Sequence, residues 1–260
     1  MTVLSAKTPD NVDRLARKVQ CKNTSTITYI DPLIDSQALV TAKDTSERVL
    51  IGISGIPGSG KSTLAASVAA RVNQLEKYSR QAAITLPMDG YHLSRAQLAA
   101  MPDPATAIHR RGAAFTFDAE AFYRLVQRLR EPLTPSTPTI YVPSFDHAIK
   151  DPIADDIPIP SSAKIVIIEG LYLSLNREPW ASAAALMDEI WFIDVDREIA
   201  QARLIKRHVA SGIVPDIAAA EHRIESTDFL NADDILQNRL PVQDVIPGNR
   251  VGEIPDLDVG

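Results

Sequence analysis

The sequence predicts an α/β protein in which a doubly wound, mostly parallel sheet is flanked by helices. Four apolar runs, at residues 49–53, 83–88, 164–168 and 189–195, are short and continuous, as strands buried on both faces are. Helix-forming stretches lie between such runs, and strand alternating with helix indicates a parallel sheet. The length of 260 residues suits one enlarged domain, and 45% hydrophobic with 23% charged residues indicates a folded chain.

Helices are predicted after the first strand and along the second half of the chain. The first covers residues 61–74, directly behind a glycine-rich turn. Asp118 is placed to cap another, whose apolar face repeats at i, i+3, i+4 and i+7 until Pro132 ends it. Further helices are expected around residues 181–187, over 196–211 with Gly212 at the end, and from Pro215 to near residue 231.

Prolines are dense between residues 132 and 160, and residues 139–142 are the only strand-like run there. Such a segment cannot be a regular helix, so we expect an excursion over the surface of the sheet. Long ordered loops in compact domains tend to be functional. The segment is therefore a candidate part of the binding site.

The chain divides into three predicted segments. Residues 1–45 form an N-terminal extension with an amphipathic helix over residues 10–19. Residues 46–240 form the main domain. Residues 241–260 form a tail in which proline and glycine recur, so we expect it to be partly mobile.

Composition and charge exclude several classes of protein. The chain has 27 Lys and Arg against 33 Asp and Glu, a formal charge of -6, which is the wrong sign for binding a nucleic-acid backbone. Cys21 is the single cysteine, so no internal disulfide is expected, and no apolar run approaches the roughly 20 residues of a membrane span. The N-terminus lacks a signal-peptide core. We therefore expect a cytoplasmic protein.

A glycine-rich turn carries the phosphate-binding signal of the sequence. It matches the pattern GxxxxGK[ST] between a predicted strand and a predicted helix, which indicates a P-loop NTPase fold. Glycines let backbone N–H groups point at a phosphate, Lys61 can reach the β- and γ-phosphates, and the Ser62 hydroxyl can bind Mg²⁺. The alternative is a turn that binds nothing. The residues predicted to bind the triphosphate are Gly55, Ile56, Pro57, Gly58, Ser59, Gly60, Lys61, Ser62 and Thr63.

Other motifs indicate which class of P-loop protein this sequence belongs to. The DxxG and NKxD motifs of signalling GTPases and the LSGGQ motif of transporter ATPases do not occur in the sequence. A small-molecule kinase remains, and phosphoryl transfer to an alcohol needs a carboxylate near the γ-phosphate. Asp89 follows the second strand at the sheet edge where α/β folds bind ligands, so we predict that it is the catalytic base, with a turn or cap aspartate as the alternative. Glu169 ends a later strand and is predicted to contact Mg²⁺ with Ser62, or else to stabilise a turn.

These motifs resemble the P-loop kinases that include uridine kinase, pantothenate kinase and phosphoribulokinase. The resemblance covers residues 49–240 and extends to a branch described as nucleoside or fructose-transport-type kinases. It implies an ATP-dependent kinase acting on a small hydroxyl compound, with Mg²⁺ and a homodimer, and it leaves the acceptor open. The resemblance is based on the following segments of the sequence: the P-loop, Asp89 to His92, Phe117-Asp118, residues 138–147 with Ser144-Phe145-Asp146, Asp151-Pro152, Ile168-Glu169-Gly170, and Arg203 to Arg207.

The same resemblance implies a helical lid. Arg203, Lys206 and Arg207 recur at i, i+3 and i+4 on one predicted helix face. In such kinases, arginines at this place close over the triphosphate and offset charge on the transferring group. Arg203 and Arg207 are the pair we prefer, and the alternative is a solvated face with ion pairs.

Residues on the acceptor side are predicted from their positions around Asp89. Tyr91 and His92 follow the base, and a packing role is the alternative for His92. Arg110 and Arg111 could bind an anionic or hydroxyl-rich acceptor, or form a surface charge pair. Asp146 and His147 lie in the proline-rich segment, which departs here from the uridine kinase pattern. Trp180 and Trp191 are expected in the core, and the histidines lack metal-ligand spacing, so no zinc site is expected.

The sequence thus predicts a kinase in which Lys61 and the lid arginines assist Asp89. A nucleotide-dependent regulator or a simple ATPase is the alternative from a different class. The presence of Asp89, Glu169 and the arginine face together argues against both, because nucleotide binding alone does not require them.

Overall fold

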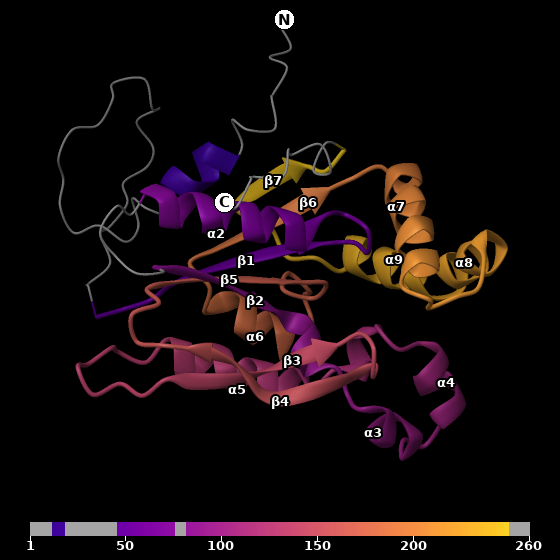
Figure 1. Cartoon of the computed structure of the whole chain (residues 1–260), viewed down its shortest axis with the longest axis horizontal. Helices are drawn as coiled ribbons and strands as arrows, with labels where there is room; N and C mark the ends of the chain where they lie inside the picture. The colour runs from indigo at the N-terminus through magenta and orange to yellow at the C-terminus, as the bar shows by residue number, and fades with distance from the viewer. Residues whose placement is uncertain (1–11, 19–45, 76–81, 250–260) are drawn as a thin grey trace, which may run out of the picture.

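A computed structural model describes residues 12–18, 46–75 and 82–249 of the chain. Its centre is a five-stranded sheet in the order β2-β5-β1-β6-β7, with every neighbouring pair parallel (Figure 1). The strands are β1 (Val49–Gly55), β2 (Ala83–Pro87), β5 (Ile165–Gly170), β6 (Glu189–Asp194) and β7 (Asp244–Pro247). The predicted doubly wound α/β fold is confirmed.

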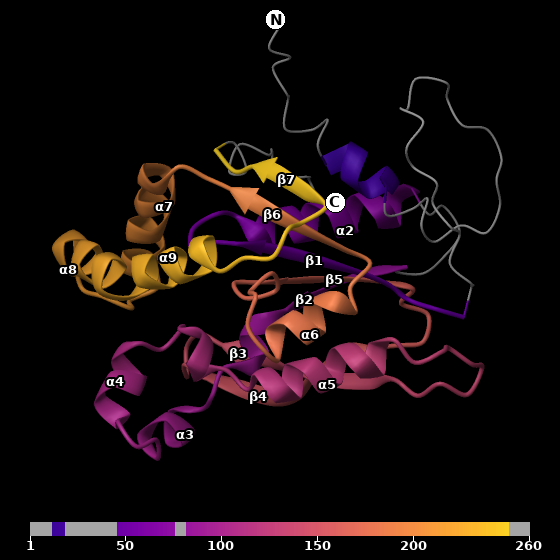
Figure 2. The same cartoon turned by 180° about the vertical axis from the view of Figure 1, so that it is seen from behind.

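Helices cover both faces of this sheet (Figures 1 and 2). Side chains of β1 alternate between two apolar cores, with Leu50 in one and Val49, Ile51 and Ile53 in the other. One core is closed by α2 (Lys61–Leu75), and the other by α5 (Ala119–Leu129) and α6 (Trp180–Ala185). Asp118 accepts a hydrogen bond from the Ala121 amide and caps α5 as predicted. Trp180 and Trp191 are core residues, 2% and 0% exposed.

The proline-rich segment is a β-hairpin: the predicted strand-like run at residues 139–142 overlaps its first strand, and the second strand was not predicted. β3 (Ile140–Asp146) pairs antiparallel with β4 (Asp151–Ile159), and the register shifts around Pro143. Proline removes a backbone donor, which disrupts a central strand but is tolerated at the edges and bulges of a two-stranded ribbon. The hairpin therefore accommodates Pro143, Pro152 and Pro158 in a segment whose composition indicated a loop.

Short helices connect β2 to α5, and a helical group follows β6. The connection contains the 3₁₀ turns η1 (Met88–Tyr91) and η2 (Ala114–Thr116) and the helices α3 (Arg95–Ala99) and α4 (Pro104–His109). The group after β6 consists of α7 (Arg197–Ala210), α8 (Ile217–Arg223), the π-helix η3 (Ile224–Asp228) and α9 (Phe229–Gln237). The last helical run was expected to end near residue 231, but it continues to Gln237.

Two peripheral segments join the core. The helix at residues 12–18 packs Leu15 and Ala16, both 0% exposed, against the α2 side of the sheet. Lys18 Nζ lies 2.8 Å from Glu189 Oε2 on β6 and 2.6 Å from Asp244 Oδ2 on β7. β7 was not predicted, because this part of the tail was expected to be partly mobile. No helix in the described part of the chain is long and apolar enough to span a bilayer.

Candidate active site

The P-loop connects β1 to α2 at the carboxyl edge of the sheet. Gly58 and Gly60 have positive φ angles of 78° and 95°, a conformation that favours glycine. A Cβ on Gly58 would lie 2.6 Å from the Ala200 carbonyl oxygen of α7. The loop therefore curls tightly, and α7 lies directly against it.

Lys61 brings a positive charge into a crowded position at the start of α2. Its Nζ donates a hydrogen bond to the Ile56 carbonyl oxygen at 3.0 Å, across the turn. Burial, and to a smaller extent the charge of Arg207, lowers the pKa of Lys61 to about 8, although the charges of Glu169 and Asp89 oppose the shift. These predicted residues from four parts of the chain therefore lie within electrostatic range of one ammonium group.

Ser62 and Glu169 face each other across the sheet edge. The Ser62 hydroxyl, which is exposed, donates to Glu169 Oε1 at 3.0 Å. Burial raises the pKa of Glu169, and the charge of Asp89 raises it as well, while Lys61 opposes both effects. β5 pairs with both β1 and β2, which explains why Glu169 lies between the P-loop and Asp89.

Asp89 lies in η1, two residues beyond the last residue of β2. The following Gly90 lets the β-hairpin approach, because a Cβ there would lie 2.0 Å from the Pro143 carbonyl oxygen. The hairpin is thereby held against the segment that carries Asp89.

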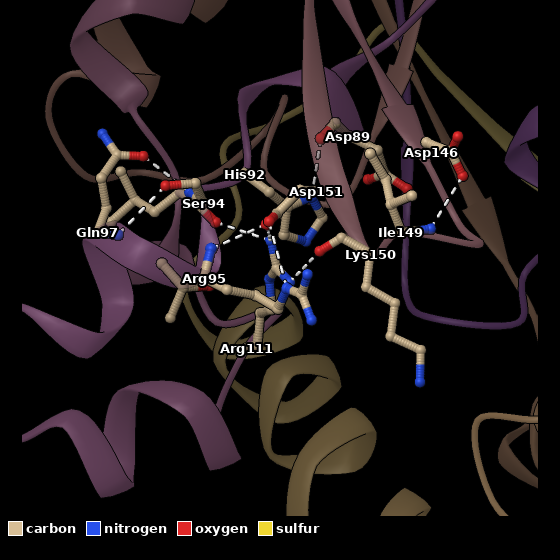
Figure 3. Close-up of polar contacts among 12 residues, drawn as sticks. Asp89, His92, Ser94, Arg95, Gln97, Arg111, Asp146, Ile149, Lys150 and Asp151 are labelled. Atoms are coloured by element: carbon tan, nitrogen blue, oxygen red, sulfur yellow. Dashed lines mark hydrogen bonds and ion pairs between the residues drawn. The ribbon is translucent and has the colours of Figure 1, made fainter.

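Aromatic rings surround His92 on the acceptor side. The His92 ring lies 4.0 Å from the ring of Phe117 and 4.9 Å from that of Phe145, measured between centroids. Its Nδ1 is 2.8 Å from the Asp89 carbonyl oxygen (Figure 3). Burial lowers the pKa of His92, which favours a neutral ring, and the charges of Arg111 and His147 act in the same direction. His147 at the hairpin tip, with its ring 5.2 Å from Phe145, therefore extends the same cluster.

The two neighbouring arginines have different surroundings. Arg111 donates to Asp151 Oδ1 at 3.1 Å and to the Lys150 carbonyl oxygen (Figure 3). It also donates to the Leu93 carbonyl oxygen at 2.8 Å. It therefore ties the hairpin to the segment after Asp89. Arg110 points elsewhere and donates to Asn231 Oδ1 on α9 at 3.1 Å.

Two further predicted acceptor residues have local structural partners. Tyr91 is 7% exposed and packs edge-on against Phe122, with ring centroids 5.4 Å apart, so its ring belongs to the core. Asp146 accepts hydrogen bonds from the amides of Ala148 and Ile149 and stabilises the hairpin turn.

The predicted lid arginines lie on α7. Arg203 NH1 is 3.4 Å from the Gly58 carbonyl oxygen and 3.5 Å from that of Ser59. Arg207, one turn later, is exposed and close enough to influence the pKa values of Lys61 and Glu169. α7 also contacts η3, because His208 is 2% exposed and its Nε2 lies 2.9 Å from Asp228 Oδ2.

Comparison with known proteins identifies the family. A protein-family model described as the phosphoribulokinase / uridine kinase family matches residues 50–212. The chain belongs to this family. It is therefore an ATP-dependent kinase by family, as the P-loop motif predicted.

Relatives of this kinase come from fungi and bacteria. The Aspergillus versicolor ATP-dependent kinase-like protein notR' is 76% identical over 162 residues, covering 62% of this chain and 94% of that protein. A Schizosaccharomyces pombe protein provisionally named uridine kinase C227.14 is 43% identical over 185 residues, covering 71% and 77%. Among solved structures, a Silicibacter sp. TM1040 protein provisionally named a fructose transport system kinase matches 91% of this chain and 98% of that one, with 30% identity and a TM-score of 0.71.

The kinase has residues that fit a magnesium ion, although the set is incomplete without nucleotide. Mg²⁺ prefers octahedral oxygen ligands at about 2.0–2.1 Å, so neighbouring ligand oxygens lie about 2.9 Å apart. The Ser62 and Glu169 oxygens are 3.0 Å apart. No group of three or more His, Cys, Asp or Glu among the described residues could hold a metal. Phosphate oxygens and water would have to supply the other ligands, as is usual for Mg²⁺.

Several residues of the kinase site were missed from the sequence. Asp151, which holds Arg111 and Arg95, was quoted only as part of the resemblance. Asn231, the partner of Arg110, lies where we had expected the last helix to end. The spacing Arg223, Thr227, Asn231 is a helical signal that could have been found, whereas the pairing of Asp151 with Arg111 depends on a hairpin that the sequence did not indicate.

Proposed function

We propose that this kinase transfers the γ-phosphate of ATP to a hydroxyl group of a small metabolite. The observation that carries the proposal is the position of Asp89 within electrostatic range of both Lys61 and Glu169. A carboxylate next to the P-loop lysine is where a base for an incoming hydroxyl is needed, whereas nucleotide binding alone does not require it.

In the proposed reaction, Asp89 hydrogen-bonds the acceptor hydroxyl and takes its proton as the oxygen attacks the γ-phosphorus. The bond from that phosphorus to the β-bridging oxygen breaks, and ADP leaves. Lys61, Arg203 and Arg207 stabilise negative charge on the transferring group and the leaving group. Ser62 and Glu169 would hold Mg²⁺, which offsets charge on the phosphate oxygens when bound.

Aromatic rings in the surroundings of Asp89 support an acceptor site there. The rings of His92, Phe117 and Phe145 form a tilted aromatic group next to the base, and His147 extends it. Exclusion of water at this place favours transfer to an alcohol over hydrolysis. The hairpin, through Phe145 and His147, would therefore help to select the acceptor.

The proposal is tested by measuring ADP formation with Mg·ATP, with and without a panel of sugars, nucleosides, polyols and hydroxy acids. Acceptor-dependent ADP formation, with a phosphorylated acceptor detected by mass spectrometry, is the expected result. Equal ADP release without any acceptor would indicate an ATPase. Tight ATP binding with no turnover across the whole panel would contradict the kinase proposal and favour a nucleotide-dependent regulator.

A further inference from the structure

Arg111 reaches from a turn beside the Asp89 segment to the tip of the β-hairpin. Its Nη2 donates to Asp151 Oδ1 at 3.1 Å, and its Nη1 donates to the Lys150 carbonyl oxygen (Figure 3). Nη2 also donates to the Leu93 carbonyl oxygen at 2.8 Å. The guanidinium therefore bridges the start of β4, at the hairpin turn, and the segment that follows Asp89.

These contacts use most of the donors of the Arg111 guanidinium. Nη2 has two N–H groups, and its two recorded acceptors are the Leu93 carbonyl oxygen and the Asp151 carboxylate. Nε is buried and has no acceptor among the described residues, so it is closed to a ligand as well. The whole side chain is only 15% exposed. Arg111 was predicted to bind the acceptor, but these contacts favour a role in holding two parts of the protein together.

Asp151, the partner on the hairpin, is held from two sides. It accepts a hydrogen bond from the Arg95 amide at 2.8 Å, and its Oδ2 lies 3.2 Å from Arg95 Nε. Although partial burial opposes the shift, hydrogen bonds from Arg95 and Arg111 lower the pKa of Asp151, so its carboxylate is charged at neutral pH. The Arg95 side chain is 64% exposed, and ion pairs of such side chains contribute little. Arg111 is therefore the stronger side-chain link.

The base from which Arg111 extends is fixed by Thr116. The Leu93 amide donates to the Thr116 carbonyl oxygen at 2.9 Å. Thr116 Oγ1 accepts from the amide of Gly112, the residue after Arg111, also at 2.9 Å. Thr116 itself is 0% exposed. The turn of Arg111 and the segment after Asp89 are thus joined to one buried residue, and the hairpin tip is attached to this base.

The ring of Phe145 connects this bridge with the acceptor side. The Arg111 guanidinium carbon lies 5.3 Å from the centroid of the Phe145 ring, within the range of a cation–π contact. The same ring lies 4.9 Å from the ring of His92, whose Nδ1 is 2.8 Å from the Asp89 carbonyl oxygen. A displaced hairpin tip would therefore move Phe145 relative to His92 and Asp89.

We propose that Arg111 is a positioning residue that holds the hairpin tip against the Asp89 segment and thereby sets the place of the Phe145 ring on the acceptor side. Arg111 acts through the hairpin and does not contact the acceptor. Asp151 is its partner in this role. The proposal rests on the proposed function for the presence of an acceptor, whereas the bridge itself is open to a test without any substrate.

The bridge is tested by hydrogen–deuterium exchange of the hairpin amides in the free protein. In Arg111→Met, amides of residues 144–153 are expected to exchange about 10–100-fold faster, as for loss of a charged hydrogen bond, while those of β1 and β5 stay protected. Arg124→Met, at an exposed position of α5, is the matched control and is expected to exchange as wild type. Unchanged exchange of the hairpin in Arg111→Met, or an equal acceleration throughout the sheet, would overturn the proposal.

The consequence for the reaction is tested with an acceptor found in the panel. Arg111→Met and Asp151→Ala are each expected to raise the acceptor KM by about tenfold or more, with the KM of ATP and kcat changed much less. The double variant should resemble the more affected single variant, because both changes remove the same bridge.

Two outcomes distinguish this role from a direct contact and from failure of the reaction. A wild-type acceptor KM in Asp151→Ala, with a raised one in Arg111→Met, would show that Arg111 acts on the acceptor directly and would overturn the positioning role. A hairpin that exchanges faster in Arg111→Met, in a protein that phosphorylates no acceptor, would retain the bridge and reject the proposed reaction.

Discussion

Lys61 illustrates how much of the site depends on a single residue. Its pKa is lowered to about 8, mainly by burial, so the free protein holds an ammonium that deprotonates near this pH. A bound triphosphate requires the charged form and must therefore raise the pKa again. ATP affinity should fall as the pH rises above about 8, by up to about tenfold per pH unit, because binding then includes the uptake of a proton.

The dissociation constant of ATP, measured between pH 7 and pH 9.5, checks this expectation. Lys61→Arg keeps its charge throughout this range and serves as the control, with an affinity that changes little with pH. A wild-type dissociation constant that is the same at pH 7 and pH 9.5 would show that Lys61 is not the titrating group.

Gly90 is a second residue on which the site depends, because the backbone of Pro143 leaves no space for a side chain there. Its ideal Cβ would lie 2.0 Å from the Pro143 carbonyl oxygen, so Gly90→Ala must push the hairpin away from η1. The variant should lose about 1–3 kcal/mol of unfolding free energy more than a control, and kcat should fall because Phe145 moves with the hairpin. Gly212→Ala is the control, since no atom lies within 4 Å of its Cβ and only its φ of 64° opposes the change, at about 1 kcal/mol. Equal losses in urea denaturation would refute the close contact as the cause.

At the scale of elements, the helix at residues 12–18 is an integral part of the α2 side of the sheet. Leu15 is completely buried there, and Lys18 connects β6 with β7. Leu15→Ala should lower the unfolding free energy by about 2–5 kcal/mol, as expected for a buried leucine. Arg17→Ala, an exposed neighbour, should change it by less than about 0.5 kcal/mol. Equal stabilities of the two variants in chemical denaturation would show that this helix is not needed by the fold.

The strands of the hairpin are the clearest case in which the sequence did not predict the secondary structure. Continuous apolar runs predicted β1, β2, β5 and β6, and helix-forming stretches next to them predicted α2, α5 and α7. β3 and β4 pair mainly with each other, so their outer edges tolerate proline, and that composition is typical of loops. β7 is four residues long and joins the sheet only through β6, which leaves little local signal.

At the scale of the whole molecule, the topology brings the predicted groups together. β1, β2 and β5 are adjacent and parallel, so the P-loop, Asp89 and Glu169 must meet at one edge. The sequence could predict this convergence because the carboxyl ends of parallel strands lie at the same edge of a sheet. It could not predict that Arg111 is held by Asp151 while Arg110 faces α9, because these pairings depend on how the hairpin and the helical group pack on the sheet.

The central claim is that Asp89 serves the acceptor and not the nucleotide. It is tested most directly by the single-turnover rate of phosphate transfer in Asp89→Asn, with an acceptor found in the panel, together with the ATP dissociation constant of the same preparation. The account predicts a rate lowered by about 10²–10⁴-fold with ATP affinity nearly unchanged. An unchanged rate, or a loss of ATP binding equal to the loss of rate, would contradict it.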